Sequence, residues 1–381
     1  MNTTYTLKFK VYRHRRNALL HQRIDIAGCI WNHCIALHRR IFRLTGKHLN
    51  QFDLMRHLTK LKKTRRFSFW NQLGSQAIQD VVQRIARAYQ LFFGNLKRGI
   101  KTAPPKFRKV KKYRSFTLKQ AGWKLLERNK IRIQGHVYKF SKSREITGKV
   151  KTVTVKRDTL GALWLTFVVE NQVEVPDRTG HSAVGFDFGL KTFLTASDGS
   201  IYHSPEFLKQ SLADLRRASR QLCRKQRYSK NWYKAKKQVA RIHQRVVNQR
   251  RDWFFKLAHE LTDQYDWLFF EDLAMKGMQA LWGRKVSDLA RSEFMHIIQW
   301  VALQKGKDVR TIDRFYPSSK TCNACAAVHA TLSLSDRHWT CQACGTNHDR
   351  DLNASVNICT EGIRCCGVGD VTRALSPAVP A

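Results

Sequence analysis

The chain has 381 residues and a large excess of basic side chains: 70 Lys and Arg against 28 Asp and Glu, a formal net charge of +42. With 43% hydrophobic and 11% aromatic residues, the composition is that of a folded protein and excludes a largely disordered one. Because so many like charges repel one another, we expect a polyanionic partner whose condensed counterions are released on binding. Charge alone leaves open a merely solubilising surface, a ribosomal-type RNA-binding scaffold and an acidic membrane.

The sequence offers no membrane or export signal. No apolar run approaches the roughly 18 residues that span a bilayer, and residues 1–16 alternate like a strand without the apolar core of a signal peptide. We therefore expect a cytoplasmic protein without a membrane partner. In that reducing compartment, ten cysteines favour metal ligation over disulfides.

The N-terminal half mixes strands and helices. Residues 4–12 alternate polar and apolar, as a half-buried strand does, and the pattern is helical from about 15 to 99. Residues 130–172 are rich in β-branched side chains, and the last two strands flank Gly161 as in a hairpin. We expect the first strand to join this group, so that the helical block is an insertion into a small barrel.

One helix of this block has a clear apolar face. Ile78, Val82 and Ile85 recur at helical spacing, with basic side chains on the opposite side. Ser75 is the predicted N-cap and Gly94 the predicted terminator. We interpret the apolar stripe as a packing surface.

A basic segment follows the break at Pro104 and Pro105. Its cations alternate with Phe107, Tyr113 and Phe116, a mixture that suits single-stranded or irregular nucleic acid. A solvated basic loop with buried aromatics is the alternative. The candidate contacts are Lys106, Arg108, Lys109, Lys111, Lys112 and Arg114.

After about residue 181, two strands precede a long helical region over roughly 205–264. Between Leu215 and Arg251 it has 14 Lys and Arg and no acidic residue, so it would repel itself unless phosphates neutralise it. We predict that it lies along nucleic acid, with Arg216, Arg217, Arg220, Arg224 and Lys225 as candidate contacts. A strand, a helix (287–305), a strand, a cysteine segment and a last helix complete the chain.

Three acidic residues stand at the ends of predicted elements. Asp187 lies in the apolar strand AVGFDFG, Glu271 ends the apolar run DWLFFE, and Asp351 opens the last helix. Burying an unpaired carboxylate costs roughly several kcal/mol, so carboxylates that converge need a counter-charge. A Mg²⁺ ion can supply it, because Mg²⁺ prefers oxygen ligands. Capping and salt-bridge roles are the alternatives.

The element order around these acids, β-β-…-α-β-α-β-α, suits an α/β RNase H-like nuclease domain. In such a site, two metal ions roughly 4 Å apart activate a water and stabilise the leaving oxygen of a phosphodiester. Asp198, Asp272 and Asp349 lie close enough in sequence to compete for the assignment.

Four cysteines form two paired knuckles. Cys322 and Cys325 are separated by fifteen residues from Cys341 and Cys344, a spacing typical of one structural, tetrahedral Zn²⁺ site. Four buried free thiols are the alternative. In the first knuckle Ala326 takes the position that usually needs glycine for a positive φ, so some strain is expected there.

Over roughly 180–360 the chain closely resembles the TnpB (OrfB) proteins of bacterial insertion sequences, which are relatives of the type V CRISPR effectors. GFDFGLKTFLTASDG, FFEDLAMKGM and YPSSKTCNAC…CQACGTNHDRDLNASVNI carry the resemblance. In the N-terminal half, SQAIQDVVQRIARAYQLFF and PPKFRKVKKYRSF look more loosely like the family's recognition helices and wedge segment.

The resemblance implies a DNA endonuclease directed by a guide RNA made from the element's own end, cutting beside a short flanking motif in a nucleoid-associated setting. Asp187, Glu271 and Asp351 match the catalytic triad, and the four knuckle cysteines match the zinc ligands. Asp351 is favoured over Asp349 because Asn353 follows at the family's spacing.

The resemblance also implies a domain plan. A wedge β-barrel is expected over 1–14 and 100–180, a helical recognition domain over 15–99, and a RuvC-like domain over 181–360 with its zinc finger at about 314–350. A weakly ordered tail is expected over 361–381. No small-molecule substrate is expected. The alternative functions are a nuclease-inactive RNA-guided DNA-binding regulator, a transposase of the same fold, and a zinc-stabilised RNA-binding protein.

Overall fold

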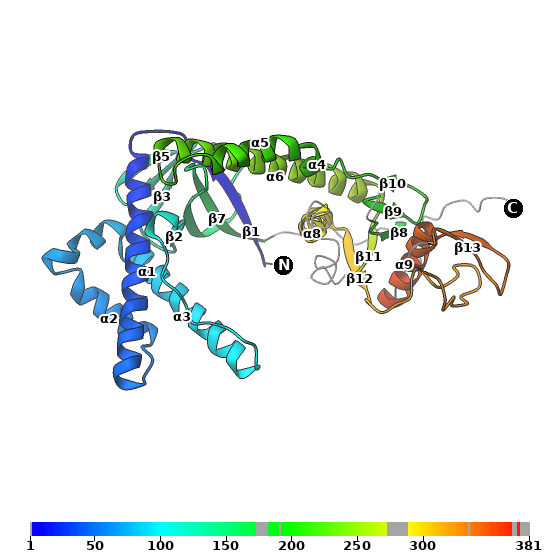
Figure 1. Cartoon of the computed structure of the whole chain (residues 1–381), viewed down its shortest axis with the longest axis horizontal. Helices are drawn as coiled ribbons and strands as arrows, with labels where there is room; N and C mark the ends of the chain where they lie inside the picture. The colour runs from blue at the N-terminus through cyan, green and yellow to red at the C-terminus, as the bar shows by residue number, and fades with distance from the viewer. Residues whose placement is uncertain are drawn as a thin grey trace. The chain divides into compact units, whose positions relative to one another are not determined.

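The computed structural model describes residues 2–172, 182–189, 192–272, 289–333, 336–367 and 372–373. The chain forms two compact units, Met1–Val173 and Glu174–Ala381, whose elements are labelled in Figure 1. Unit 1 contains β1 (Asn2–Lys10), α1 (Asn17–Thr45), α2 (Gln51–Leu61), η1 (Arg65–Leu73), α3 (Ser75–Lys97), η2 (Val110–Lys112), β2 (Ser115–Leu118), β3 (Trp123–Leu126), β4 (Lys130–Ile133), β5 (His136–Lys139), β6 (Lys149–Arg157) and β7 (Leu163–Gln172).

The strands of unit 1 form two antiparallel sheets. The four-stranded sheet has the order β1-β7-β6-β2 and the other the order β3-β4-β5. The predicted pairing of the first strand and the hairpin around Gly161 are confirmed, and Gly161 adopts a φ of +85° at the turn. A bridge between Val11 and Phe140 connects the sheets. Closure into a barrel stays a prediction.

The helical insertion shares one hydrophobic core with these sheets. The predicted apolar stripe of α3 is confirmed, because Ile78, Val82 and Ile85 are all buried. The predicted ends of that helix are wrong. Gly74 precedes the helix without a side-chain cap, so Ser75 is its first residue, and the helix runs through Gly94 to Lys97.

Unit 2 is built around one mixed sheet. Its elements are β8 (Ser182–Asp187), β9 (Leu194–Ala196), β10 (Ile201–Tyr202), α4 (Phe207–Gln210), α5 (Leu212–Cys223), α6 (Lys230–Gln264), β11 (Trp267–Glu271), α8 (Arg291–Lys305), β12 (Asp308–Ile312), β13 (His338–Thr340), β14 (Asn347–Asp349), α9 (Arg350–Cys366) and β15 (Thr372–Arg373). The main strand order is β10-β9-β8-β11-β12, and β15 pairs with β8. Strands β8 to β10 are antiparallel, whereas β8, β11 and β12 are parallel. The order of strands and helices along the chain agrees with the predicted succession of elements.

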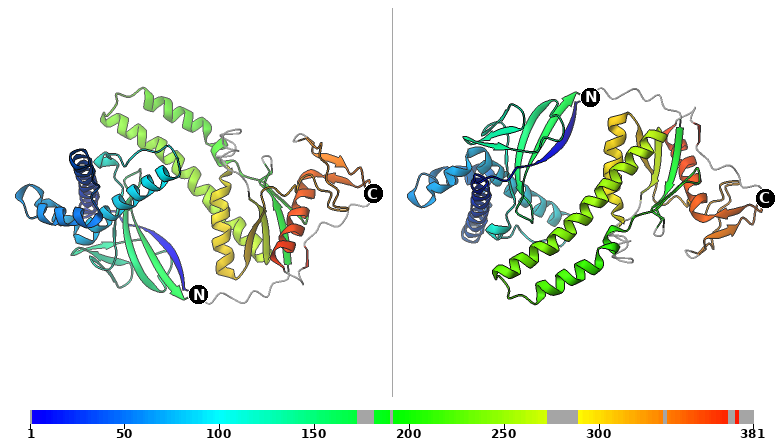
Figure 2. Two further views of the ribbon diagram at one scale, coloured as in Figure 1. Left: turned by 90° about the horizontal axis from the view of Figure 1, so that it is seen from below. Right: turned by 90° about the horizontal axis from the view of Figure 1, so that it is seen from above.

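Helices cover both faces of this sheet (Figure 2). On one face, Phe186 and Phe270 pack with the apolar side chains of α6 and α8. On the other face, Ala183 and Phe269 pack against Ile358 of α9. Neighbouring strand residues thus point to opposite faces, and both faces are buried, as expected for parallel strands flanked by helices.

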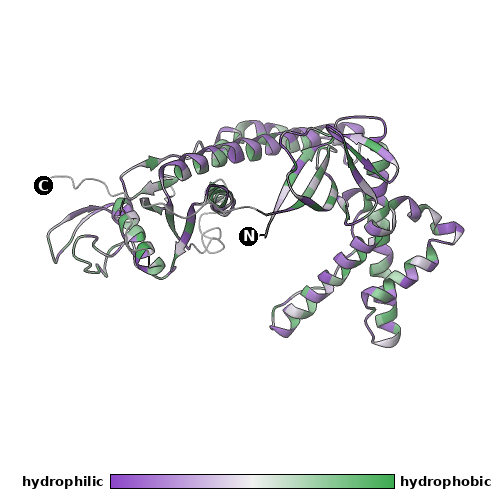
Figure 3. Cartoon of the chain, turned by 180° about the vertical axis from the view of Figure 1, so that it is seen from behind, coloured by the Kyte–Doolittle hydropathy of each residue, from purple (hydrophilic) through white to green (hydrophobic). Residues whose placement is uncertain are grey.

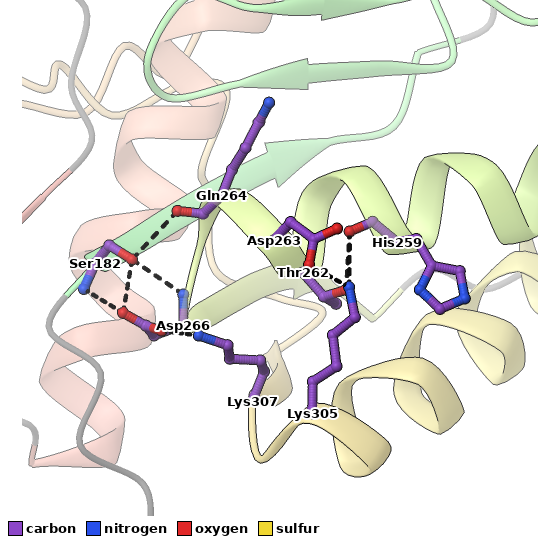
Figure 4. A network of polar contacts seen from close by, with 8 residues as sticks. All are labelled: Ser182, His259, Thr262, Asp263, Gln264, Asp266, Lys305 and Lys307. Carbon is purple, nitrogen blue, oxygen red and sulfur yellow. Dashed lines mark hydrogen bonds and ion pairs between the residues drawn. The ribbon is translucent and has the colours of Figure 1, made fainter.

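A polar network fixes the amino ends of the parallel strands (Figure 4). The backbone N–H and hydroxyl of Ser182 donate to the Asp266 carboxylate at 3.0 and 2.8 Å, and Lys307 pairs with the same carboxylate. Lys305 pairs with Asp263 at 2.6 Å. The Asp266 contacts join the start of β8 to the residues just before β11 and β12, and the Lys305–Asp263 pair joins α8 to α6.

The C-terminal helix continues beyond the predicted start of the tail. α9 ends at Cys366, six residues past 360, and Thr372–Arg373 pair with β8. The rest of the predicted tail lies outside the described residues. Among those described, no helix combines the length and apolarity needed to cross a membrane.

Candidate active site

Asp187 and Glu271 end two neighbouring parallel strands. Phe186 pairs with Phe270 in the ladder, and the two acids are the next residues along each strand. Since Phe186 and Phe270 face α6 and α8, strand alternation directs both carboxylates toward the face that α9 covers.

The backbone of α9 approaches β8 unusually closely. A Cβ on Gly185 would lie 2.1 Å from the Ser355 carbonyl oxygen and 2.4 Å from the Cys359 nitrogen. Asp351 is one helical turn before Ser355, and Asp187 is two strand residues beyond Gly185. These steps are both about 6 Å long. On the far side of Gly185, the Cys359 thiol donates to the Ala183 carbonyl, so α9 and β8 run in opposite directions and Asp351 lies toward Asp187.

Electrostatic interactions link Asp187 to Asp351 and Glu271 to Asp187. Burial and the Asp351 charge raise the pKa of Asp187 to about 6, and burial and the Asp187 charge raise the pKa of Glu271 to about 7. Like charges brought together out of water favour protonation. The sequence prediction that these acids converge is therefore supported by both topology and electrostatics.

Arg291 supplies a counter-charge that sequence reasoning missed. It is the first residue of α8, only 2% exposed, and donates hydrogen bonds to the carbonyl oxygens of Phe188 and Gly189 at 3.1 and 2.7 Å. Burial lowers the pKa of Arg291 to about 10, while Asp187 and Glu271 oppose that effect. An arginine opening a helix gives no pattern that distinguishes it from a surface residue, so the sequence carried no signal for this role.

Arg337 holds the third acid. Its guanidinium donates to both carboxylate oxygens of Asp351, at 3.0 and 3.1 Å. Among the described residues, the four cysteines alone form a group of three or more potential metal ligands whose atoms lie within 4.8 Å of one another. The three acids are thus neighbours without forming so tight a cluster.

The competing acids have other partners. Asp349 is the N-cap of α9, where its carboxylate accepts from the Leu352 N–H at 2.9 Å. Asp272 pairs with Arg314 at 2.6 Å. Asp198 accepts from the Ser200 N–H at 2.9 Å. Asp351 is paired too, with Arg337, but its charge raises the pKa of Asp187, which favours Asp351 as the third member.

The cysteine knuckles form a site that fits a tetrahedral zinc ion. The Cys322 and Cys344 sulfurs are 3.7 Å apart, and those of Cys325 and Cys341 are 3.6 Å apart. Sulfurs about 2.3 Å from a central Zn²⁺ lie about 3.8 Å from one another, far more than the ~2.05 Å of a disulfide. The predicted site is therefore geometrically supported.

Both knuckles use the same backbone turn. Ala326 N–H donates to the Cys322 carbonyl at 2.9 Å, and Gly345 N–H donates to the Cys341 carbonyl at 2.8 Å. Ala326 has a φ of 62° and Gly345 a φ of 74°. The predicted positive φ at Ala326 is confirmed.

Two buried asparagines attach the first knuckle to α9. Asn353 donates to the Thr321 carbonyl at 2.8 Å and accepts from the Asn323 N–H at 3.0 Å. Asn357 donates to the Ser318 and Thr321 carbonyls. The zinc segment is thereby tied to the helix that presents Asp351. Sequence analysis had given Asn357 no role.

The basic segment in unit 1 is only partly as predicted. Tyr113 and Phe116 are buried in the core, so the alternative is correct for these two aromatics, whereas Phe107 is 51% exposed. Arg108 lies over the Trp31 ring, and Lys111 pairs with Asp25 at 2.8 Å. The candidate cations Lys106, Arg108, Lys109, Lys111, Lys112 and Arg114 are all exposed.

The candidate cations of unit 2 lie on and just after α5. Arg216, Arg217, Arg220, Arg224 and Lys225 are exposed, and the four arginines line one pocket. Phosphate oxygens are the ligands that suit several guanidinium groups on one surface. A role in binding stays a prediction.

Comparisons with known proteins agree with these features. A family model of the OrfB_IS605 type, described as "Probable transposase", matches residues 166–281, and a Cas12f1-like TNB domain model matches residues 292–358. A Streptomyces pristinaespiralis protein named "Putative RNA-guided DNA endonuclease" is 30% identical over 322 residues, which are 83% of this chain and 78% of that protein.

The similarity extends to a further bacterial relative and to a solved structure. "Putative RNA-guided DNA endonuclease InsQ" of Escherichia coli strain K12 is 26% identical over 91% of this chain and 89% of its own length. A solved structure described as "Cryo-EM structure of the Cas12f1-sgRNA-target DNA complex" has a TM-score of 0.56 and 14% identity, covering 94% of this chain and 98% of that one, which shows a shared fold. This chain belongs to the TnpB (OrfB) family of insertion-sequence proteins.

Proposed function

We propose that this protein is an RNA-guided DNA endonuclease of a transposable element. This proposal is supported by two observations: Asp187 and Glu271 end adjacent parallel strands, and the Asp351 charge raises the pKa of Asp187. Membership of the family, with relatives named as RNA-guided DNA endonucleases, supports the same conclusion. Unit 2 would be the RuvC-like nuclease domain, and unit 1 the wedge barrel with its helical recognition insertion.

The carboxylates are suited to hold Mg²⁺, which prefers oxygen ligands, and two such ions would activate a water and stabilise the leaving oxygen. The protein's own contribution is position. Gly185 lets α9 bring Asp351 against β8, and Arg291 holds the carbonyls that follow Asp187. Arg337 donates to both oxygens of Asp351, so it would share this carboxylate with a bound metal ion.

The partners follow from charge. The excess of cations, concentrated between Leu215 and Arg251 and after Pro105, is suited to the phosphates of a guide RNA and a target DNA. We propose that the guide derives from the element's end and that cutting occurs beside a short flanking motif. The zinc site would stabilise the segment that supports α9, and a nucleoid-associated cytoplasmic location would follow from DNA binding.

The test is guided cleavage. The protein is expressed with its native flanking DNA, the co-purifying RNA is sequenced, and matched and mismatched DNA duplexes are offered with Mg²⁺. We expect one discrete RNA and cutting of the matched duplex only. Absence of a discrete RNA would refute guidance. Binding without cutting would identify a DNA-binding regulator, and joined element ends would identify a transposase.

A further inference from the structure

An aromatic cluster marks the end of the α5–α6 hairpin, beyond the arginines discussed above. Tyr228 lies in the connection between the helices, and Trp232 and Tyr233 lie in the first turn of α6. Tyr228 and Tyr233 are 57% and 49% exposed. We call these three residues the aromatic tip. None of them belongs to a hydrophobic core cluster formed by the described residues.

The tip is ordered by local contacts. The ring centroids of Tyr228 and Trp232 are 5.7 Å apart, and those of Trp232 and Tyr233 are 5.1 Å apart with a nearly perpendicular arrangement. Ser229 caps α6 by accepting from the Trp232 N–H at 3.1 Å. Tyr228 has a φ of 72°, a conformation that costs energy for a residue with a Cβ.

Cations accompany the rings. The Arg227 guanidinium lies 5.1 Å from the Tyr228 ring centroid, and the Lys236 ammonium lies 4.9 Å from that of Trp232. No acidic residue occurs between Leu215 and Arg251. The hairpin ribbon is coloured mainly as hydrophilic in Figure 3. An apolar protein surface would leave these charges without partners, whereas a nucleic acid offers both base faces and phosphates.

We propose that the aromatic tip stacks on unpaired bases of a bound RNA, while the neighbouring cations contact the flanking phosphates. An aromatic face can take a base only where the base is unstacked, and RNA presents such bases in loops, bulges and ends. Duplex DNA keeps its bases stacked. The inference rests on the proposed function for the presence of an RNA, and it assigns the tip a separate, sequence-tolerant contact with it.

The test compares two RNA probes of equal length, a hairpin with an unpaired loop and a blunt duplex. Wild-type protein should prefer the looped RNA. The double variant Tyr228→Ser/Tyr233→Ser should bind looped RNA roughly 10-fold or more weakly, as expected for loss of base stacking, and duplex RNA as well as wild type does. Circular dichroism should show unchanged helix content, because both rings are outside the core.

Two controls make the result specific. Arg216→Gln/Arg220→Gln should weaken binding of both probes alike, because both probes carry phosphates. Ile201→Ser should change the binding of neither probe, since that exposed apolar side chain lies on β10, outside the elements to which nucleic-acid binding is assigned. Equal losses on both probes, or no loss, would overturn the proposal. The proposal would also be overturned if the tyrosine variant lost more affinity for single-stranded DNA, or for vesicles of anionic lipid, than for looped RNA.

Guided cleavage is measured separately on the same variants at saturating RNA. If the tyrosine variant binds looped RNA normally while wild type cuts DNA, the stacking proposal fails and the nuclease proposal stands. If looped-RNA binding depends on the tip but no matched duplex is cut, the stacking proposal stands and the nuclease proposal fails.

Discussion

Replacing Asp187 by asparagine should stabilise the metal-free protein at high pH while abolishing cleavage. The pKa of Asp187 is raised from 3.8 to about 6, so the folded state binds this proton more tightly than the unfolded chain does. The favourable contribution is therefore complete below about pH 4 and is lost as the pH rises through 6. At pH 8 the ionised carboxylate costs up to about 3 kcal/mol.

Solvent reduces that figure. Asp187 is partly exposed, so screening leaves roughly 1–2 kcal/mol. For a unit of this size, that corresponds to a rise of about 2–8 °C in the melting temperature of the metal-free Asp187→Asn protein at pH 8.

The assay is thermal melting of the full chain in a magnesium chelator that leaves zinc bound, at pH 4 and pH 8. The melting temperature of Asp187→Asn should be higher than that of the wild type at pH 8 and equal to it at pH 4. Asp272→Asn is the matched control, because Asp272 is exposed and paired with Arg314, and it should give no gain. A destabilised Asp187→Asn at pH 8 would refute the electrostatic reasoning.

Three further changes test the supporting structure. Arg291→Met should move the pH dependence of cleavage upward, because the pKa values of Asp187 and Glu271 rise when they lose a counter-charge; an unchanged pH profile would contradict this. Gly185→Ala should destabilise unit 2 by roughly 3 kcal/mol or more through its clash with α9, as strong overpacking does, whereas Gly94→Ala, with open space around it, should be neutral or stabilising in the same melting assay. Ala326→Gly should slow zinc loss to a chelator and Gly345→Ala should speed it, because both positions have positive φ; equal rates would show that backbone strain is unimportant there.

The sequence predicted those features that rest on local pattern. Alternation placed the strand at the N-terminus and its partners, and apolar runs ending in acids located the carboxyl ends of β8 and β11. Cysteine spacing located the knuckles, since a metal site imposes its geometry on short stretches of chain. Asp187 and Glu271 were predictable because a buried strand that ends in a carboxylate is chemically costly.

The features that sequence reasoning missed depend on tertiary contacts. Arg291 becomes a buried counter-charge only because α8 begins beside the end of β8. Asn357 gains its role from a segment 36 residues away, and Tyr113 is buried by α1 against expectation. The predicted end of α3 was wrong because a glycine such as Gly94 is tolerated inside a helix at a modest cost in stability.

The most direct test of the central claim is the cleavage rate of single-acid variants in the purified RNA-bound protein. Asp187→Asn, Glu271→Gln and Asp351→Asn should each retain binding of matched DNA and lose cutting by several orders of magnitude, whereas Asp349→Asn should lose only stability. Cutting at near wild-type rate by any of the first three would contradict a shared three-carboxylate site.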